Sequence, residues 1–187
     1  KRDMNPALLG ILQCLFNGCS SQICLGDQMS STLDIHSGLL QGSILSPILY
    51  SAFINPLIQA LVDTQLGIDI GGRRFCCLAY ADDLVLFADS ASNLQALLDA
   101  AYDHSRRYRF QFNARKSNTM ISHPAEAPLQ IGGEELESVE SFTYLGIPFT
   151  CNGIDWKTHM DRMIARSNRV VNFLKDVGCF QSGFSTD

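Results

Sequence analysis

The chain has 187 residues, of which 46% are hydrophobic and 18% are charged, and its formal net charge is −5. This length suits one domain, or one domain and the start of a second, and the apolar fraction excludes wholesale disorder. No apolar run reaches the roughly 18 residues of a membrane span, and the first residues lack the apolar core of a signal peptide. The net acidity argues against a nucleic-acid-binding protein unless the basic residues are gathered in one place.

The hydrophobic pattern predicts helices that alternate with short strands. Helices are expected over residues 5–18, 46–62, 92–107 and 154–177. Ser46 and Pro47 mark the start of the second helix, with Ser46 as N-cap and Pro47 at the first helical position. Pro56 is expected to kink or divide the same helix, because proline has no backbone N–H to donate.

Strand patterns fall between these helices. They comprise a hairpin at residues 22–36, two apolar runs at 75–80 and 84–88, and short strands at 117–122, 129–131, 135–139 and 143–149. The pairs Gly26-Asp27 and Gly132-Gly133 predict tight turns. This order of elements indicates an α+β fold in which helices cover one side of a sheet.

The cysteine and histidine content offers no metal centre. There are seven cysteines, an odd number, and none forms the C-x-x-C pair of a zinc ribbon. Without an export signal we expect reduced, mostly buried thiols and no disulfide-linked partner. The four histidines are scattered and show neither metal-ligand nor triad spacing.

The strongest local pattern is the adjacent pair Asp82 and Asp83 between two apolar runs. Aspartate is common in turns, so a solvated turn is the plain explanation for an arbitrary pair. Here hydrophobic residues continue right up to the acids, and two like charges held together raise their pKa values. A divalent cation removes that penalty, and carboxylate oxygens are the ligands that Mg²⁺ prefers. Two such metals can activate a 3′-hydroxyl and stabilise a leaving pyrophosphate.

Residues 80–83 (YADD) resemble the YxDD motif of reverse transcriptases, and their surroundings resemble the enzymes of non-LTR (LINE-type) retrotransposons. Three more segments resemble that family and follow its order. Residues 38–50 are similar to its template- and nucleotide-binding segment, 112–117 to its lysine-bearing segment, and 144–149 to its primer-grip hairpin. Any one motif alone is weak, whereas the four together are specific.

The resemblance implies a set of site residues. Asp82 and Asp83 would be the metal ligands, with Asp82 the better one, and Lys116 would protonate the departing pyrophosphate. The residues expected beside the template and the nucleotide are Gln41, Gly42, Ser46, Pro47, Tyr80 and Ala81. Those of the primer-grip-like hairpin are Tyr144, Leu145 and Gly146.

Six arginines are expected to contact the nucleic-acid backbone: Arg106, Arg107, Arg109, Arg162, Arg166 and Arg169. Residues 106–116 hold five basic and no acidic side chains, so the positive charge is concentrated there despite the acidic total. Plain structural explanations stand beside these assignments. Cations suit the C-terminal end of any helix, and a glycine-rich loop often leads into one.

By this resemblance the fold is a polymerase palm-type antiparallel sheet with helices packed on one face, followed by the beginning of a helical thumb. The expected divisions are residues 1–140 for a partial palm, 141–151 for the primer-grip-like hairpin, and 152–187 for the start of the thumb. The family carries a third metal-binding carboxylate in an AFD-like segment, and none stands before Gln41. We therefore expect a fragment cut just after that segment, inactive by itself.

The implied function is RNA-directed DNA polymerisation, a template-directed nucleotidyl transfer with two Mg²⁺ ions. Its partners would be an RNA template, a DNA primer and deoxynucleoside triphosphates, with no membrane, inside the cell in the nucleus or cytoplasm. A relic palm that at most binds nucleic acid or protein is an alternative. An intact AFD-like segment upstream would favour the enzyme, and a stop codon there the relic. An unrelated Mg²⁺ phosphodiesterase is a third reading, which leaves Gln41, Gly42 and residues 144–149 unexplained.

Overall fold

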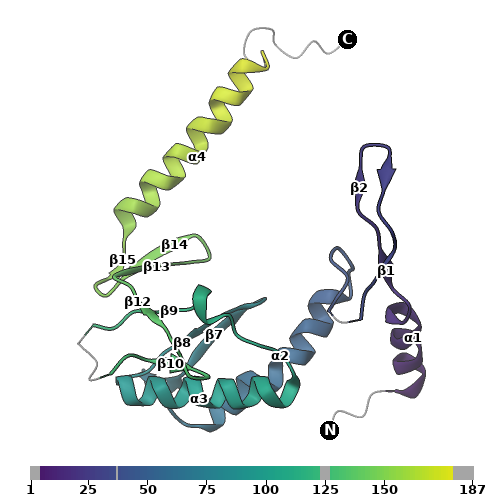
Figure 1. Ribbon diagram of the computed structural model, residues 1–187. Coiled ribbons are helices and arrows are strands. Elements are labelled where there is room, and N and C mark those ends of the chain that lie inside the picture. The colour runs from purple at the N-terminus through teal and green to yellow at the C-terminus, as the bar shows by residue number, and fades with distance from the viewer. Residues whose placement is uncertain (1–4, 37, 123–126, 179–187) are drawn as a thin grey trace. The chain divides into compact units, whose positions relative to one another are not determined.

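The computed structural model describes residues 5–36, 38–122 and 127–178. Its helices are α1 (Pro6–Phe16), α2 (Ser46–Asp63), α3 (Ala91–Tyr108) and α4 (Trp156–Asp176), with a 3₁₀ turn η1 at Ala114–Lys116 (Figure 1). Contacts between Cα atoms divide the chain into two units, Lys1–Phe53 and Ile54–Asp187. Each unit is described by itself.

The strands are short. In the first unit they are β1 (Ser20–Ser21), β2 (Cys24–Leu25), β3 (Gln28–Met29) and β4 (Leu33–Asp34). In the second they are β5 (Ile68–Ile70), β6 (Arg73–Phe75), β7 (Cys77–Tyr80), β8 (Asp83–Leu86), β9 (Asn118–Thr119), β10 (Gln130–Ile131), β11 (Glu134–Glu135), β12 (Glu137–Ser138), β13 (Ser141–Tyr144), β14 (Ile147–Thr150) and β15 (Gly153–Ile154).

The first unit has the helix and the hairpin that the sequence predicts. The Asn5 side chain accepts a hydrogen bond from the Ala7 backbone N–H at 2.9 Å, which caps α1, and Pro6 takes the first helical position. Strands β2 and β3 pair across the Gly26-Asp27 turn, and β1 pairs with β4 further from that turn.

The start of α2 differs from the prediction. The first helical hydrogen bond runs from the Leu49 N–H to the Leu45 carbonyl, so Leu45 and not Ser46 precedes the helix. The Ser46 hydroxyl instead donates to the Leu40 carbonyl at 2.6 Å. Pro56 does not divide the helix, which continues to Asp63. Losing one helical hydrogen bond is tolerated there because Leu57 and Leu61, just beyond the proline, are fully buried.

The core of the second unit lies between α2, α3 and the β7–β8 hairpin. Leu57 and Leu61 of α2 pack against Leu97 and Ala101 of α3 and against Cys76, which precedes β7. A second cluster continues this core under η1 and the short strands, and its buried members are Leu98, Ala114, Leu129, Ile131 and Leu136. Leu97, Leu98 and Ala101 thus lie on the buried face of α3, whose N-cap is Ser90.

One hairpin is absent from the sequence prediction. Strands β5 and β6 pair across Gly71-Gly72, whose φ values of 62° and 79° are both positive. Two consecutive positive φ angles define a two-residue turn of type I′, for which Gly-Gly is a known signature. The missed clue was this dipeptide between the segments Ile68–Ile70 and Arg73–Phe75.

The α+β composition is confirmed, but one continuous sheet is not seen. In the described part of the chain the strands form seven small sheets, six of two strands and one of three. The pair β9–β12 is parallel, and the other pairs are antiparallel. The strand pattern at 143–149 is interrupted by a turn, because Leu145 and Gly146 both have positive φ and reverse the chain direction. The segment is therefore a hairpin, as the resemblance to a primer-grip hairpin implies.

The six described cysteines are all free, in agreement with the expected reduced thiols. Cys14, Cys24 and Cys151 are exposed, so the expectation that most cysteines are buried is wrong. The pKa of the Cys77 thiol is raised to about 12, mainly by burial and to a smaller extent by the neighbouring Cys76 thiol. This pKa keeps Cys77 protonated and unreactive. No helix in the described ranges is both long and apolar enough to cross a membrane.

Candidate active site

Asp82 and Asp83 lie at the turn of the β7–β8 hairpin. Tyr80 pairs with Asp83, so Ala81 and Asp82 are the two turn residues and Asp83 is the first residue of β8. Ala81 has a φ of 49°, in the left-handed region that costs a residue with a side chain about 1–2 kcal/mol. A positive φ at the first turn residue alone is the pattern of type II′ turns, which suit the twist of a hairpin.

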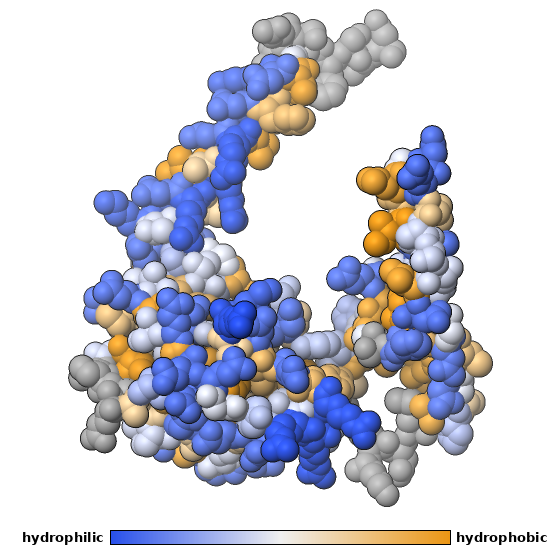
Figure 2. All heavy atoms as spheres, in the orientation of Figure 1, coloured by the Kyte–Doolittle hydropathy of each residue, from blue (hydrophilic) through white to orange (hydrophobic). Residues whose placement is uncertain are grey.

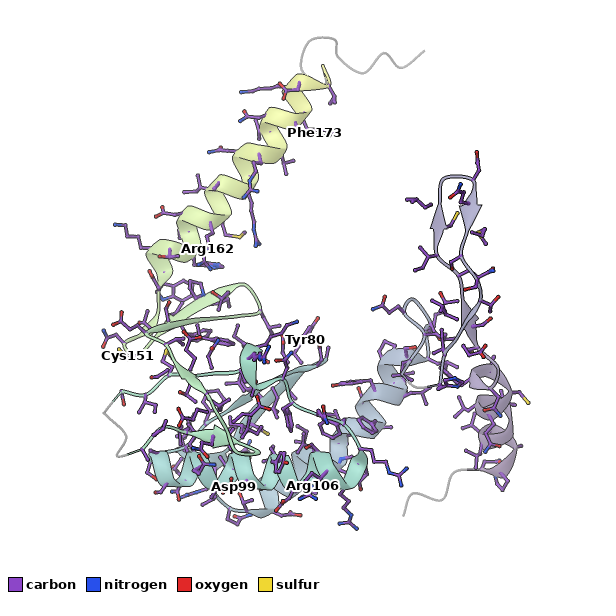
Figure 3. All side chains as sticks on the ribbon, viewed as in Figure 1. Tyr80, Asp99, Arg106, Cys151, Arg162 and Phe173 are labelled. Atoms are coloured by element: carbon purple, nitrogen blue, oxygen red, sulfur yellow. The ribbon has the colours of Figure 1, made fainter. Side chains whose placement is uncertain are left out.

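The two faces of this hairpin have different surroundings. Cys77, Leu84 and Leu86 pack against the core formed with α2 and α3. Because side chains alternate along a strand and paired residues share a face, Tyr80 and Asp83 point away from that core. Tyr80 is 63% exposed, so it is not an ordinary buried strand aromatic (Figure 3).

Both carboxylates are exposed and available to a cation. In the described ranges neither the Asp82 nor the Asp83 side chain has a hydrogen-bond or ion-pair partner. Hard carboxylate oxygens beside each other match the ligand preference of Mg²⁺. The same ranges hold no group of three or more His, Cys, Asp or Glu side chains that could bind a metal ion together.

Lys116 is the last residue of η1, in the same unit as the aspartates. Its backbone N–H donates to the Asn113 carbonyl at 3.0 Å, and the neighbouring Ala114 is buried in the second core cluster. The Lys116 side chain is exposed and forms no ion pair with either aspartate. The structure therefore holds the backbone of Lys116 firmly and leaves its ammonium group free.

Gln41 and Gly42 form a turn in the first unit. Gly42 has a φ of 84° but no atom within 4 Å of a Cβ built there, so the backbone conformation and not crowding requires glycine. The Ser46 hydroxyl closes this turn through its bond to the Leu40 carbonyl, and Pro47 continues the helix. Ser46 thus has a structural partner that the sequence did not indicate.

The predicted primer-grip-like segment is a well-formed hairpin. Leu145 and Gly146, with φ values of 49° and 83°, are its two turn residues, and Tyr144 pairs with Ile147. Leu145 is 51% exposed at the turn. Strand β15 pairs with β14 and leads directly into α4.

Helix α4 has both apolar and basic residues on its surface. None of its residues is buried, and in Figure 2 orange and blue side chains lie next to each other along it. Its exposed apolar residues include Met160, Met163, Ile164, Val170 and Val171. Arg162 donates a hydrogen bond from Nη1 to Thr143 Oγ1 at 3.2 Å, whereas neither Arg166 nor Arg169 forms a side-chain hydrogen bond within the described ranges.

The Asp155 carboxylate accepts from the Thr158 backbone N–H at 3.0 Å and caps α4. Hydrogen bonds from Thr158 hold the pKa of Asp155 below the ordinary value. The bond from the Thr158 side chain has the larger effect and the bond from its backbone the smaller. A depressed folded-state pKa contributes stability above the unfolded pKa, and this contribution disappears as pH falls through the folded value. We expect the Thr158 amide to lose hydrogen-exchange protection on acidification below about pH 4.

The matched variant is Asp155→Asn, whose amide also caps a helix but does not titrate. Its Thr158 protection, measured by NMR with correction for the intrinsic exchange rate, should be nearly independent of pH over the same range. Equal loss of protection in both proteins would show that the Asp155 charge does not stabilise this helix end.

The arginines at the end of α3 lie apart from the aspartates. Leu97, Ala101 and Ser105 form the buried side of α3, and helical geometry turns Arg106 and Arg107, which are both exposed, away from that side. Arg106 is labelled in Figure 3. Asp83 points away from α3 on the far face of the hairpin. Arg109, with a φ of 59°, ends the helix.

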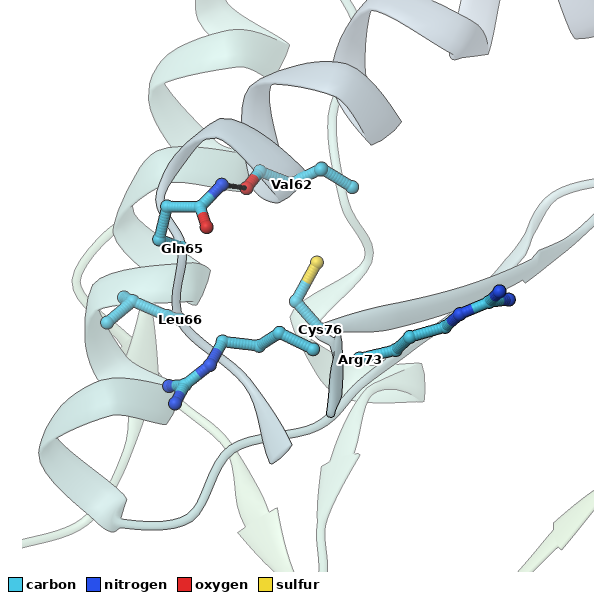
Figure 4. Close-up of a pocket in the computed structure, with 6 residues that line it drawn as sticks. Val62, Gln65, Leu66, Arg73 and Cys76 are labelled. Atoms are coloured by element: carbon cyan, nitrogen blue, oxygen red, sulfur yellow. Dashed lines mark hydrogen bonds between the residues drawn. The ribbon is translucent and has the colours of Figure 1, made fainter. Parts of the chain in front are cut away.

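A hollow of about 240 Å³ lies between the end of α2 and strand β6 (Figure 4). Its lining residues are Val62, Gln65, Leu66, Arg73, Arg74 and Cys76. The Gln65 side chain donates to the Val62 carbonyl at 3.1 Å across one wall. The lining has no carboxylate, so this hollow does not hold a Mg²⁺ site of the kind considered for the hairpin.

An α+β domain that presents two adjacent aspartates without side-chain partners on a hairpin is a candidate for binding a divalent metal ion. Comparison with known families matches residues 9–149 to the family described as reverse transcriptase (RNA-dependent DNA polymerase). This chain belongs to that family. This match confirms the reverse transcriptase family that the sequence motifs predict.

Known relatives come from mobile elements. The chain is 33% identical over 128 residues to the retrovirus-related Pol polyprotein of the type-2 retrotransposable element R2DM of Drosophila melanogaster, covering 62% of this chain and 12% of that protein. It is 27% identical over 146 residues to an R2 polyprotein of Popillia japonica, covering 72% and 24%. It is 24% identical over 181 residues to the RNA-directed DNA polymerase from mobile element jockey of D. melanogaster, covering 92% and 18%.

These relatives confirm the expected likeness to non-LTR retrotransposon proteins. The chain spans a quarter or less of the length of each of the three, 12% to 24%. The activity of the complete proteins is therefore only proposed for this chain.

Proposed function

We propose that this chain is part of an RNA-directed DNA polymerase and carries the aspartate hairpin of its nucleotidyl-transfer site. The observation that carries the proposal is the β7–β8 hairpin. Its inner face is packed on α2 and α3, while Asp82 and Asp83 are exposed and unpaired in the described ranges. Family membership supports the same chemistry.

Asp82 and Asp83 would hold Mg²⁺, with the third carboxylate supplied by an AFD-like segment that is not among these 187 residues. When bound, such metals supply the positive charge that stabilises the attacking and leaving oxygens. Packing of the hairpin on α2 and α3 positions the two carboxylates before substrate binds, which is the main requirement for electrostatic catalysis. Lys116, exposed on an anchored turn, would give a proton to the pyrophosphate as it leaves.

Other residues would position the substrates. Gln41 and Gly42, in the turn that Ser46 closes before Pro47, would lie along the template and the nascent base pair, and Ala81 and the exposed Tyr80 beside the nucleotide. Tyr144, Leu145 and Gly146 would contact the primer end. Arg166 and Arg169, which are exposed on α4, would contact phosphates.

The corresponding domain division is residues 1–140 for a partial palm, 141–151 for the primer-grip-like hairpin, and 152–187 for the start of a thumb. It is supported by the β13–β15 sheet, which is separate from the other strands and precedes α4. The proposed partners are an RNA template, a DNA primer and deoxynucleoside triphosphates, and the proposed place of action is the nucleus or the cytoplasm.

Primer extension on an RNA template tests the function. We expect Mg²⁺-dependent DNA synthesis when residues 1–187 are joined to the upstream AFD-containing segment of an R2 relative. Residues 1–187 by themselves should give none, because they supply two of the three carboxylates. Synthesis by the 187 residues alone, or its absence from the joined protein although that protein folds, would contradict the proposal.

A relic palm that binds nucleic acid without catalysis is the second candidate. The observation in its favour is that the described ranges hold no cluster of three or more metal-binding side chains. It predicts duplex binding in the joined protein with no extension at any Mg²⁺ concentration. Measuring both quantities on one sample separates the two candidates.

A further inference from the structure

Arg162 differs from Arg166 and Arg169 in what its guanidinium contacts. Nη1 of Arg162 donates to Thr143 Oγ1 at 3.2 Å, which links α4 to strand β13. Thr143 precedes Tyr144 and the turn at Leu145, and Arg162 lies at the end of α4 nearest the hairpin (Figure 3). Both side chains are exposed, so this bond is not a consequence of close core packing.

A second link joins the same β13–β14 hairpin to Asp155, the residue just before α4. The Asp155 backbone N–H donates to the Pro148 carbonyl at 3.0 Å, and Pro148 is the residue that pairs with Thr143 across the hairpin. Asp155 and Arg162 are seven residues apart, which is about two helical turns or roughly 10 Å of helix. A helix attached at one point can tilt about it, whereas two attachments this far apart restrain its direction.

We propose that Arg162 is a positioning residue for the primer–template duplex. Acting through Thr143, it holds α4 at one angle to the β13–β14 hairpin and thereby places Arg166 and Arg169 relative to the Leu145 turn. This inference rests on the proposed function, in which α4 and the hairpin hold one duplex. It removes Arg162 from the group of arginines that contact phosphates directly.

The test is binding of a fluorescent RNA–DNA hairpin duplex to the whole chain at several salt concentrations. Thr143→Val, which keeps the branched shape but loses the acceptor, and Arg162→Lys, which keeps the charge, should each weaken binding roughly three- to tenfold. The double variant should be no weaker than either single one, because both remove the same link. Thr143→Ser keeps a hydroxyl and should bind like the unchanged chain.

The salt dependence separates positioning from direct contact. Thr143→Val should leave the slope of log affinity against log salt unchanged, whereas Arg166→Gln should reduce it by about one phosphate contact. The proposal is overturned if Thr143→Val and Arg162→Lys both bind normally while Arg162→Gln reduces the slope by one. That result would make Arg162 an ordinary phosphate ligand.

Residual dipolar couplings give a readout that does not depend on the duplex. In the unchanged chain and in Thr143→Ser, the amides of α4 and of β13–β14 should fit one common alignment. In Thr143→Val the α4 couplings should shrink as the helix gains freedom, and unchanged couplings would refute the positioning role. Absence of duplex binding together with shrunken couplings would instead reject the proposed function and leave the link between hairpin and helix standing.

Discussion

Asp82→Asn is expected to reduce Mg²⁺-dependent primer extension by the joined protein by at least about 100-fold. The loss should exceed the 10- to 100-fold that follows removal of an outer-shell partner, because Asp82 would touch the metal itself. Asparagine keeps the shape and the turn preference of aspartate but removes the charge. Primer extension at saturating nucleotide, across a range of Mg²⁺ and Mn²⁺ concentrations, measures the effect.

The folded state should not lose stability with this change. Asp82 and Asp83 are exposed like charges next to each other, so removing one relieves a repulsion, and the urea midpoint should stay the same or rise. The matched control is Asp99→Asn on α3, whose carboxylate accepts from the Gln95 side chain at 2.8 Å (Figure 3). Equal loss of activity in both variants, or loss of activity together with the fold, would argue against Asp82 as a metal ligand.

Gly67→Ala should destabilise the second unit by about 3 kcal/mol or more. Gly67 has a φ of 117°, and a Cβ there would overlap the Phe75 carbonyl oxygen and lie 2.9 Å from the Cys76 Cα. These are backbone atoms next to the β5–β6 pair and the buried Cys76, so they cannot move aside as a flexible side chain could. Urea unfolding followed by circular dichroism gives the change in free energy.

Gly71→Ala is the matched control in the same hairpin. Gly71 has a φ of 62° but open space around the position of a Cβ, so only the backbone cost of about 1 kcal/mol is expected. If the two variants lose the same stability, crowding at Gly67 contributes nothing and the close approach to Phe75 is not a constraint. A larger loss for Gly67→Ala supports the observed packing of β5 on the chain before β7.

Local patterns predicted part of this structure correctly. The turns at Gly26 and Gly132 were readable, because each depends on the φ angle of one or two residues. The two apolar runs on either side of Asp82 and Asp83 likewise indicated a hairpin. The Gly71-Gly72 turn was equally readable and was missed.

Other features depend on residues that meet only after folding. The partner of Ser46 is Leu40, and the partner of Arg162 is Thr143, 19 residues earlier in the chain. Nothing in the spacing of the arginines on α4 distinguishes Arg162 from Arg166. The same holds for Arg106 and Arg107, whose exposure follows from which side of α3 is buried.

The sequence alone therefore determined the family, the aspartate pair and the hairpins that carry the motifs. These reside in short segments whose conformation depends on nearest neighbours along the chain. Only the tertiary structure decided which face of the β7–β8 hairpin is buried, which arginine of α4 is hydrogen-bonded to Thr143, and that the strands form small separate sheets. Each of these is a contact between distant residues, and its geometry depends on every turn between them.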